Sequence, residues 1–573
     1  MTIIELIRQL LPNGTDAFAV GEEPAAQHDA VDYTKCPTWP PDLFAVIGSI
    51  IDRSGCYTLA SPDREALAAH QERLDEISTC TQAWNHTISV IPEIVQVLWA
   101  ETATTYADVR LAAVSKNATL VNILLILFAA ADEASVGMGW DVDPGEAMRR
   151  KFASVAFAAL TRGDAEVSLP YESRSLCVMV PAEQAIVLPK SITSSVGCTI
   201  RSLSHHLALL PPVSVLEPRW ILSSKKAQKD ADADPAAPYP LRLLLVPFPF
   251  TIHASSFKLS SRRQKLGTSE NHVPAYFELL QNWLEPSGET LTAERLATQL
   301  ILKLIDQARD ETGAAPHGVI LPECALSTEL AGRLAEALAG SGIDFLITGS
   351  LDTIDGKHRN RALTFVYQED GRITMDDQNK HHRWRLDRSQ TERYALDFDD
   401  DHENNQWWED IDVNERKLPF FGLRKDMSLA TLICEDLART DPAMTAIRAV
   451  GPNLVVALLM DGPQLAVRWP GRYATVLAED PGSAVLSFTC AAMVDRSNWV
   501  EAKPARSIGL WRDGGGRTQE IGLPEDALGV MLTLQSKQKH QNTLDNRSDN
   551  SLSRQLTLRT VVPLFLADRP TWI

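Results

Sequence analysis

The sequence predicts a mainly helical N-terminal region followed by an α/β domain, and three observations lead to this fold class. Apolar residues recur at helical spacing over residues 61–77 and 91–131. A polar stretch with alternating aspartates and several prolines, QKDADADPAAPYP, then interrupts the pattern. Beyond it, short apolar runs alternate with helical patterns, which is typical of an α/β domain. We therefore expect a helical domain over residues 1–227, a linker over 228–240 and an α/β domain over 241–573.

Composition excludes several classes of protein. The 573 residues carry a formal net charge of -19, which repels phosphate backbones and argues against nucleic-acid binding. The eight cysteines show no CxxC and no paired spacing, so neither a disulfide scaffold nor a zinc framework is expected. The N-terminus, MTIIELIRQLLPNG, has the pattern of an amphipathic helix and lacks the layout of a signal peptide. We expect a cytoplasmic protein in a reducing environment.

The helical region contains one strongly apolar segment, residues 118–131. It is shorter than the roughly 20 residues that span a bilayer, so we expect a buried helix and no membrane span. Asp143 and Pro144 look like a cap and first turn that open a further helix over residues 145–160. Residues 176–188 and 200–213 are ambiguous and could form strands, and no catalytic motif occurs in them.

The α/β region predicts an ordered series of buried strands and helices. A helix is expected over residues 291–309, another from the cap Ser327 to residue 340, and a third between residues 441 and 451. Residues 362–368 and 372–374 have the pattern of a hairpin. Buried strands are expected at residues 241–246, 318–321, 345–349, 429–433 and 453–460.

Three reactive side chains come at the end of an expected buried strand or after the expected hairpin. Glu323 ends LPE, Lys380 lies in NKHH, and Cys434 lies in LICED. Because the carboxyl ends of strands meet at one edge of an α/β sheet, these three side chains are expected to form one site. A cysteine thiolate is a strong nucleophile, and a carboxylate and a lysine could serve as its base and as an oxyanion donor.

The order of these motifs resembles the nitrilase superfamily. GVILPE, FLITGS, RNRALTFVY, LATLICED, GPNLVVALL and WPGRYATVLAED follow one another as in that family, and the resemblance covers about residues 241 to 565. It implies a four-layer αββα sandwich with a catalytic triad of Glu323, Lys380 and Cys434. Glu392, in TERY, matches the second glutamate of the family, which positions Lys380.

The resemblance also implies the chemistry. Cys434 would attack an amide or nitrile carbon, Glu323 would move the protons, and Lys380 with the backbone N–H of Glu435 would stabilise the oxyanion. His382 belongs to the KxH motif and is expected near the substrate. The mechanism needs no cofactor and no metal. Members of the family often pair through a helix-bearing face, so a homo-oligomer is expected.

An acidic segment, ALDFDDDHENNQWWEDIDVNERK, separates Glu392 from the strand at 429–433. It carries too many charges for a core, so we expect a loop or lid near the pocket mouth. Its run Asp399 to Glu403 lacks the spacing of a metal site and is expected to be solvated. Trp407 and Trp408 either close over a substrate or anchor the loop.

The sequence thus predicts hydrolysis of a non-peptide C–N bond in a small amide, nitrile or carbamoyl compound. Two alternatives remain open. The nitrilase-like domain could serve as a binding or signalling module in a larger assembly such as a bacterial defence system, or as an amidase gated by a protein partner that docks on the N-terminal domain. The thioester could also be captured by an amine, which would make the protein an acyl transferase.

Overall fold

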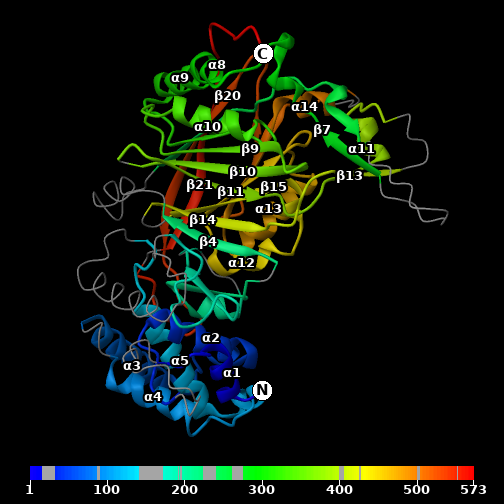
Figure 1. Ribbon diagram of the computed structural model, residues 1–573. Coiled ribbons are helices and arrows are strands. Elements are labelled where there is room, and N and C mark those ends of the chain that lie inside the picture. Colours follow the sequence, from blue (N-terminus) through cyan, green and yellow to red (C-terminus); the bar gives the residue numbers. More distant parts are fainter. Residues whose placement is uncertain are drawn as a thin grey trace, which may run out of the picture.

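The architecture is taken from a computed structural model of the chain (Figure 1). The structure describes residues 1–15, 32–86, 91–140, 172–191, 193, 197–213, 215–222, 240–260, 275–368, 370–398, 405–424, 427–499, 504–550 and 553–573. Within these ranges, each helix is too short or too polar to cross a membrane.

Helices form the N-terminal end of the molecule, at the bottom of Figure 1. The buried helix expected at residues 118–131 is confirmed, and the expected helix at the N-terminus begins at a capping box between Thr2 and Glu5. The helix expected at 61–77 begins later, at Leu67, because the segment before it contains a proline. The helix expected at 145–160 lies outside the described residues. The helices are α1 (Ile3–Leu10), α2 (Pro40–Ser54), α3 (Leu67–His86), α4 (Glu93–Ala103) and α5 (Ala118–Glu133).

Seven of the described strands form one large sheet, in the order β11-β10-β9-β8-β5-β20-β21. The strands expected at 241–246, 318–321 and 345–349 are confirmed as β5, β8 and β9, and the expected hairpin is β10 with β11. The bounds are β5 (Pro240–Leu245), β8 (Gly318–Ile320), β9 (Phe345–Ile354), β10 (Lys357–Tyr367), β11 (Ile373–Asn379), β20 (Gly529–Lys539) and β21 (Ser553–Leu564).

Eight of the described strands form a second large sheet, in the order β1-β4-β14-β15-β16-β17-β18-β19. The strands expected at 429–433 and 453–460 are confirmed as β15 and β16, which run parallel to each other. The bounds are β1 (Glu172–Ser173), β4 (Glu217–Leu222), β14 (Lys417–Arg424), β15 (Met427–Ile433), β16 (Leu454–Leu459), β17 (Ala484–Thr489), β18 (Ser507–Arg512) and β19 (Thr518–Gly522).

Strands β1 and β4 precede the expected linker, yet they belong to this second sheet. β4 runs parallel to β14, with Trp220 opposite Phe420, and Trp220 is fully buried. A domain boundary at residue 228 would therefore separate β1 and β4 from the other strands of their sheet. Of the expected linker, residues 228–239 lie outside the described residues, and Pro240 begins β5. The ambiguous segments upstream contribute a hairpin of β2 (Ile186–Pro189) and β3 (Leu207–Leu210).

Core residues alternate along the central strands. In β5, Leu243 and Leu245 belong to a cluster that also contains Leu454 and Val456 of β16, so this cluster joins the two large sheets. Leu244, between them in the sequence, belongs to the cluster of helices α8 (Ala293–Leu296), α9 (Leu302–Thr312) and α10 (Thr328–Ala337). Successive side chains of a strand point to opposite faces, so β5 is buried on both.

The second sheet is buried in the same manner. Val455 and Ala457 of β16 belong to a cluster with residues of α12 (Ala443–Val450) and α13 (Trp469–Glu479), on the side away from β5. Burial on both faces explains why β16 is a continuous apolar run and why Arg242 is the single charged residue of β5. It also gives the strand ends that carry the reactive residues a rigid support.

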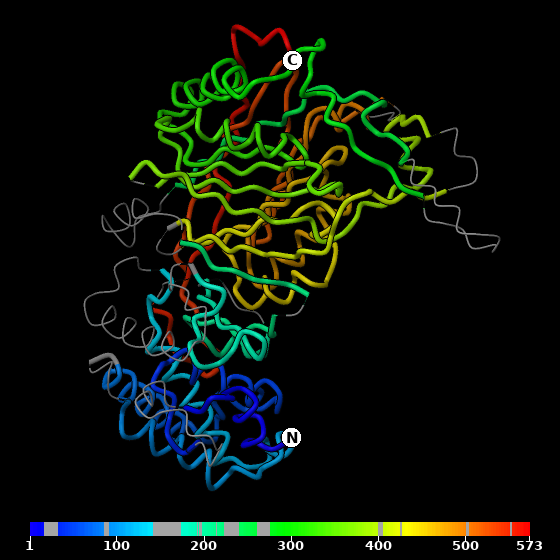
Figure 2. Tube along the Cα trace, viewed as in Figure 1, coloured from blue at the N-terminus to red at the C-terminus, as the bar shows by residue number. Residues whose placement is uncertain are grey.

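The turn between β20 and β21 joins the sheets to the helical region, where the red trace meets the blue and cyan segments in Figure 2. Arg547, in this turn, is buried and contacts Asp132 and Glu133 at the end of α5. Its Nε donates to Asp545 at 3.0 Å, and its Nη2 donates to the backbone carbonyl of Leu203. A buried guanidinium with several acceptors is stable only while those acceptors remain in place.

Replacement of Arg547 by glutamine is expected to destabilise the protein by about 3–5 kcal/mol, because it leaves buried carboxylates without their cation. Urea unfolding of the full chain measures this change. The control is Arg569→Gln, which breaks an exposed pair with Asp526 and is expected to change stability by less than about 0.5 kcal/mol. Equal stability of the two variants would contradict a structural role for the Arg547 junction.

Candidate active site

Glu323, Lys380 and Cys434 each lie just beyond the end of a strand, as the sequence predicts. Glu323 follows β8, Lys380 follows β11, and Cys434 follows β15. All three side chains are buried, with 2%, 1% and 3% of their surface exposed. The first two come from the seven-stranded sheet and the third from the eight-stranded sheet.

Cys434 occupies a strained turn between β15 and the short 3₁₀ helix η9 (Cys434–Ala438). Its φ angle is 46°, in the left-handed region. This conformation costs a residue with a side chain about 1–2 kcal/mol. Such strain persists where the surroundings fix the backbone, and it concentrates at functional positions. A sharp turn from strand to helix is also the way in which other hydrolases present a nucleophile.

Glu323 is fixed by a close approach of two backbones. Gly349 in β9 donates its N–H to the carbonyl of Pro322 at 3.0 Å. A Cβ atom at Gly349 would lie 2.5 Å from the Cα atom of Glu323, so the position has no room for any side chain. A larger residue at 349 would displace the turn that carries the carboxylate.

Lys380 lies between two buried carboxylates. Its Nζ donates to Glu323 Oε1 at 2.8 Å and to Glu409 Oε2 at 2.7 Å. The side-chain amide of Asn360 also joins the two acids, because its Nδ2 donates to Glu323 Oε1 at 2.8 Å and to Glu409 Oε1 at 2.9 Å. The second oxygen of Glu323, Oε2, is buried and has no hydrogen-bond partner among the described residues. It is therefore available as a proton acceptor.

The electrostatics of the site follow from burial and from these contacts. Burial and the nearby Glu409 raise the pKa of Glu323 above its ordinary value, although Lys380 opposes the shift. Burial alone would lower the pKa of Lys380, but the two carboxylates raise it well above its ordinary value. Burial and then the charge of Glu323 raise the pKa of the Cys434 thiol well above its ordinary value. At neutral pH the resting site thus holds a thiol and an ammonium ion.

The second glutamate beside Lys380 is Glu409, which corrects the assignment of that position to Glu392. Glu392 is exposed on α11 (Arg388–Arg393), whereas Glu409 is buried in β13 (Gln406–Glu409) and accepts the N–H of Trp384 at 2.9 Å. The charge of the acidic segment predicts a loop, yet residues 406–409 form a strand. The signal in it is the alternation in QWWE, where Trp407 and Glu409 are buried and the residue between them is half-exposed.

Asp436, in the cysteine motif, links the Lys380 segment to the Cys434 turn. Its buried carboxylate accepts the backbone N–H of His381 at 3.1 Å and that of His382 at 3.0 Å. The Nδ1 atom of His382 lies 3.0 Å from the same carboxylate. His382 therefore contributes to the position of the lysine segment, a role that the motif alone does not reveal.

The tryptophans of the acidic segment belong to a smaller, four-stranded sheet, β12-β13-β7-β6. Trp407 is fully buried, its ring centroid is 5.2 Å from that of Phe398, and the guanidinium of Arg388 lies 4.7 Å from it. These contacts favour the anchoring role over a substrate contact. Trp408 is half-buried, with Arg385 over its ring at 5.7 Å. The other strands are β12 (Arg385–Asp387), β7 (Ala275–Leu279) and β6 (Phe257–Leu259).

The carboxylate of Glu435 forms an ion pair with Arg439 at 2.6 Å, so a role in the site would fall to its backbone N–H alone. The acidic run from Asp399 to Glu403 lies outside the described residues.

One group of potential metal ligands occurs in the described ranges, away from the Cys434 turn. Ligand atoms of Glu133, His205 and His206 lie within 4.8 Å of one another. The guanidinium of Arg547 contacts Glu133, so a metal ion would have to share this carboxylate with a fixed cation. Glu133, His205 and His206 therefore fit a structural role beside Arg547 better than they fit a metal site.

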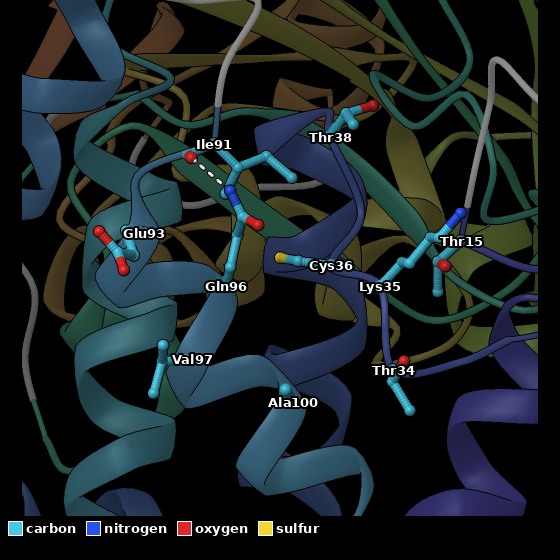
Figure 3. Close-up of a pocket in the computed structure, with 10 residues that line it drawn as sticks. All are labelled: Thr15, Thr34, Lys35, Cys36, Thr38, Ile91, Glu93, Gln96, Val97 and Ala100. Atoms are coloured by element: carbon cyan, nitrogen blue, oxygen red, sulfur yellow. Dashed lines mark hydrogen bonds between the residues drawn. The ribbon is translucent and has the colours of Figure 1, made fainter.

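The helical region contains a cavity of about 690 Å³, shown in Figure 3. Lys35, Cys36, Glu93 and Gln96 are among the side chains that line it, and Gln96 donates to the carbonyl of Ile91 at 2.8 Å. Burial raises the pKa of the Cys36 thiol well above its ordinary value, and this thiol donates to the carbonyl of Pro37 at 3.6 Å.

Comparison with known proteins gives matches among solved structures alone. No protein-family model matches the sequence, and no curated protein matches it. Nit3 of Saccharomyces cerevisiae, a nitrilase-superfamily member, is 15% identical over 49% of this chain and 86% of its own, with a TM-score of 0.30. XC1258 of Xanthomonas campestris, a CN-hydrolase superfamily protein, is 15% identical over 52% of this chain and 90% of its own, with a TM-score of 0.29.

A third match is the glutamine-dependent NAD(+) synthetase of Cytophaga hutchinsonii, which is 11% identical over 52% of this chain and 43% of its own, with a TM-score of 0.28. Similarity at this level transfers neither an activity nor a substrate. Of these three structures, Nit3 belongs to the nitrilase superfamily and XC1258 to the CN-hydrolase superfamily.

Proposed function

We propose that this chain is a thiol-dependent hydrolase of the nitrilase type, which cleaves a non-peptide C–N bond, preferably that of an amide. The observation that carries the proposal is the buried ammonium of Lys380, held by Glu323 and Glu409 within electrostatic reach of a strained Cys434 turn. The proposed fold is a four-layer αββα sandwich. The core shared by the two large sheets and the helices packed against the other face of each support this layering.

Acylation would begin with the thiol proton of Cys434. As sulfur attacks the substrate carbon, this proton passes to Oε2 of Glu323, the oxygen without another partner. The S–C bond forms and the negative charge moves to the substrate oxygen. When the C–N bond breaks, the proton on Glu323 passes to the departing nitrogen, and the acyl group stays on Cys434 as a thioester.

Deacylation would use the same groups in reverse. Water attacks the thioester carbon, Glu323 accepts a proton from the water, and that proton returns to the sulfur as the acid leaves. Lys380 and the backbone N–H of Glu435 would donate to the oxyanion in both steps. The loss of one such donor typically costs on the order of 10² to 10³ in rate.

Glu409 would keep Lys380 charged and in position. A buried ammonium with a single carboxylate would have weaker compensation for its lost hydration than one with two. Asn360, which bridges both acids, would hold them at the spacing that fits the ammonium. Neither residue needs to touch the substrate to affect the rate.

Exposure to a panel of amides, nitriles and carbamoyl compounds is expected to give an acyl adduct on Cys434 and release of ammonia. Intact-protein mass spectrometry and an ammonia assay would measure both. Cys434→Ala is expected to lose both signals, while Cys198→Ala, which removes an exposed thiol, should keep them.

An adduct that persists in Cys434→Ala would rule out this nucleophile. If no compound reacts and a thiol-reactive probe also fails to label Cys434 selectively, the binding-module alternative is favoured. Selective labelling without turnover would indicate a larger substrate or an enzyme that requires a partner.

Glu409→Gln is expected to lower kcat by roughly 10²-fold, because it removes one of the two charges that hold the Lys380 donor. The matched variant Glu392→Gln carries the same chemical change on an exposed residue and should stay within about twofold of the wild type. Steady-state kinetics with the first substrate found in the panel would measure kcat for both variants and for the wild type. A loss confined to Glu392→Gln would restore the assignment made from the sequence.

The pH dependence of kcat/KM is expected to show an acid limb above about 4.3, the ordinary pKa of glutamate. Glu323 accepts the thiol proton only as a carboxylate, so activity falls as pH falls through its raised pKa. Glu409→Gln removes a charge that raises this pKa and should move the limb to lower pH. An acid limb at the same pH in Glu409→Gln as in the wild type would indicate that a group other than Glu323 controls the limb.

A further inference from the structure

A second cavity, of about 250 Å³, lies among residues that follow β16 and flank α11 and α14 (Ala491–Asn498). It is formed by the end of α11, the loop between β16 and α13, and the end of α14. Its polar lining residues are Arg393, Arg468, Ser497 and Asn498. A cavity of this size accommodates a small group and is below the range of sites that enclose a large ligand.

Asp461 lies at the strand ends near Cys434 and binds an arginine of the cavity lining. Cys434 and Asp461 follow the neighbouring parallel strands β15 and β16, in which Ile433 is paired with Leu458. The carboxylate of Asp461 is among the charges that raise the pKa of the Cys434 thiol. The same carboxylate accepts a hydrogen bond from Arg468 Nη2 at 2.8 Å, and Arg468 lines the cavity. The pair of Asp461 and Arg468 therefore links the lining of the cavity to the strand ends that carry Cys434.

The arginines around the cavity are not fully neutralised. Arg393 forms no ion pair or hydrogen bond in the described part of the chain. Arg468 is paired with Asp461, and its second hydrogen bond goes to the carbonyl of Pro463 at 2.7 Å. Each guanidinium has five N–H donors, so both arginines retain donors for a ligand.

A third arginine adds positive charge behind the cavity. Arg496 is buried in α14, the helix that supplies Ser497 and Asn498. Its guanidinium donates to the carbonyls of Tyr394, Ala395 and Ile252 at 2.9, 2.7 and 3.0 Å. No carboxylate of the described residues pairs with it, so its charge contributes to the potential in the cavity.

We propose that the substrate carries an anionic group, a carboxylate, and that Arg393 binds this group in the cavity while the scissile carbon lies at Cys434. This inference rests on the proposed function and names its substrate class: an amide of small size with a carboxylate beyond the reacting carbon. A planar guanidinium binds a carboxylate through two parallel hydrogen bonds, which is the recognition that arginine performs best. The whole chain has a net charge of -19, so a cavity lined by arginines differs in sign from the chain as a whole.

Two alkylating reagents that differ in charge test the proposal before a substrate is known. Iodoacetate and iodoacetamide both transfer a two-carbon group to a thiol with loss of iodide, and only the first is an anion. The rate of alkylation of Cys434 by each reagent would be followed by peptide mass spectrometry on the full chain at neutral pH. The ratio of the two rates, anion over neutral, is the measured quantity.

We expect Arg393→Gln to lower this ratio by about tenfold, which is the effect of the loss of a hydrogen bond to a charged group. Arg393→Lys keeps the charge and should restore part of the preference, which separates the loss of charge from a change in fold. Arg472→Gln removes an equal charge from an exposed position on α13 and should leave the ratio unchanged.

Three results would overturn the proposal: an unchanged ratio in Arg393→Gln, an equal fall in Arg472→Gln, or no alkylation of Cys434 by either reagent. The last would mean that the cavity does not lead to the thiol. The test is separate from that of hydrolysis, because alkylation needs no turnover. Charge-selective alkylation without hydrolysis of any amide would support the anion site and reject the proposed reaction. Hydrolysis without charge selectivity would support the reaction and reject the anion site.

Discussion

One buried positive charge, the ammonium of Lys380, sets the conditions for the rest of the site. Removal of an ammonium from water costs several kcal/mol even after the protein relaxes, so it must be compensated by close acceptors. Glu323 and Glu409 supply them at 2.8 and 2.7 Å. The two acids would repel each other without the lysine, and Asn360 satisfies one oxygen of each. Each of these groups is therefore stable only because the others are present.

This arrangement requires the sheets to be rigid. Glu323 follows β8, Lys380 follows β11 and Glu409 belongs to β13, while Cys434 comes from the other large sheet. A shift of about 1 Å between them would weaken the hydrogen bonds and misplace the reacting groups. Apolar packing on both faces of the central strands resists such a shift, since interiors are packed as densely as organic crystals. Asp436 adds a polar link between the Lys380 segment and the Cys434 turn.

The sequence predicts the parts of this structure that depend on local pattern. Mainly apolar runs predict β5, β8, β15 and β16, and the reactive residues just after β8 and β15 predict Glu323 and Cys434. Glu409 could not be found in this way, because its strand is short and lies in a segment whose charge is typical of a loop. The pairing of β4 with β14 and the contact of Arg547 with α5 depend on residues far apart in the chain, and neither leaves a periodic signal. Long-range pairing of this kind is decided by the packed fold and by no single segment.

The place of β20 in its sheet has a consequence for the order of events during synthesis. β20 lies between β5 and β21, so it covers the edge of the strand next to β8, which leads to Glu323. A ribosome-bound chain that ends before residue 529 already contains Cys434, yet it still has β5 as an open edge. The nucleophile is therefore made before the sheet that positions its base can be completed, and the nascent chain passes through a stage at which the thiol exists without its finished site.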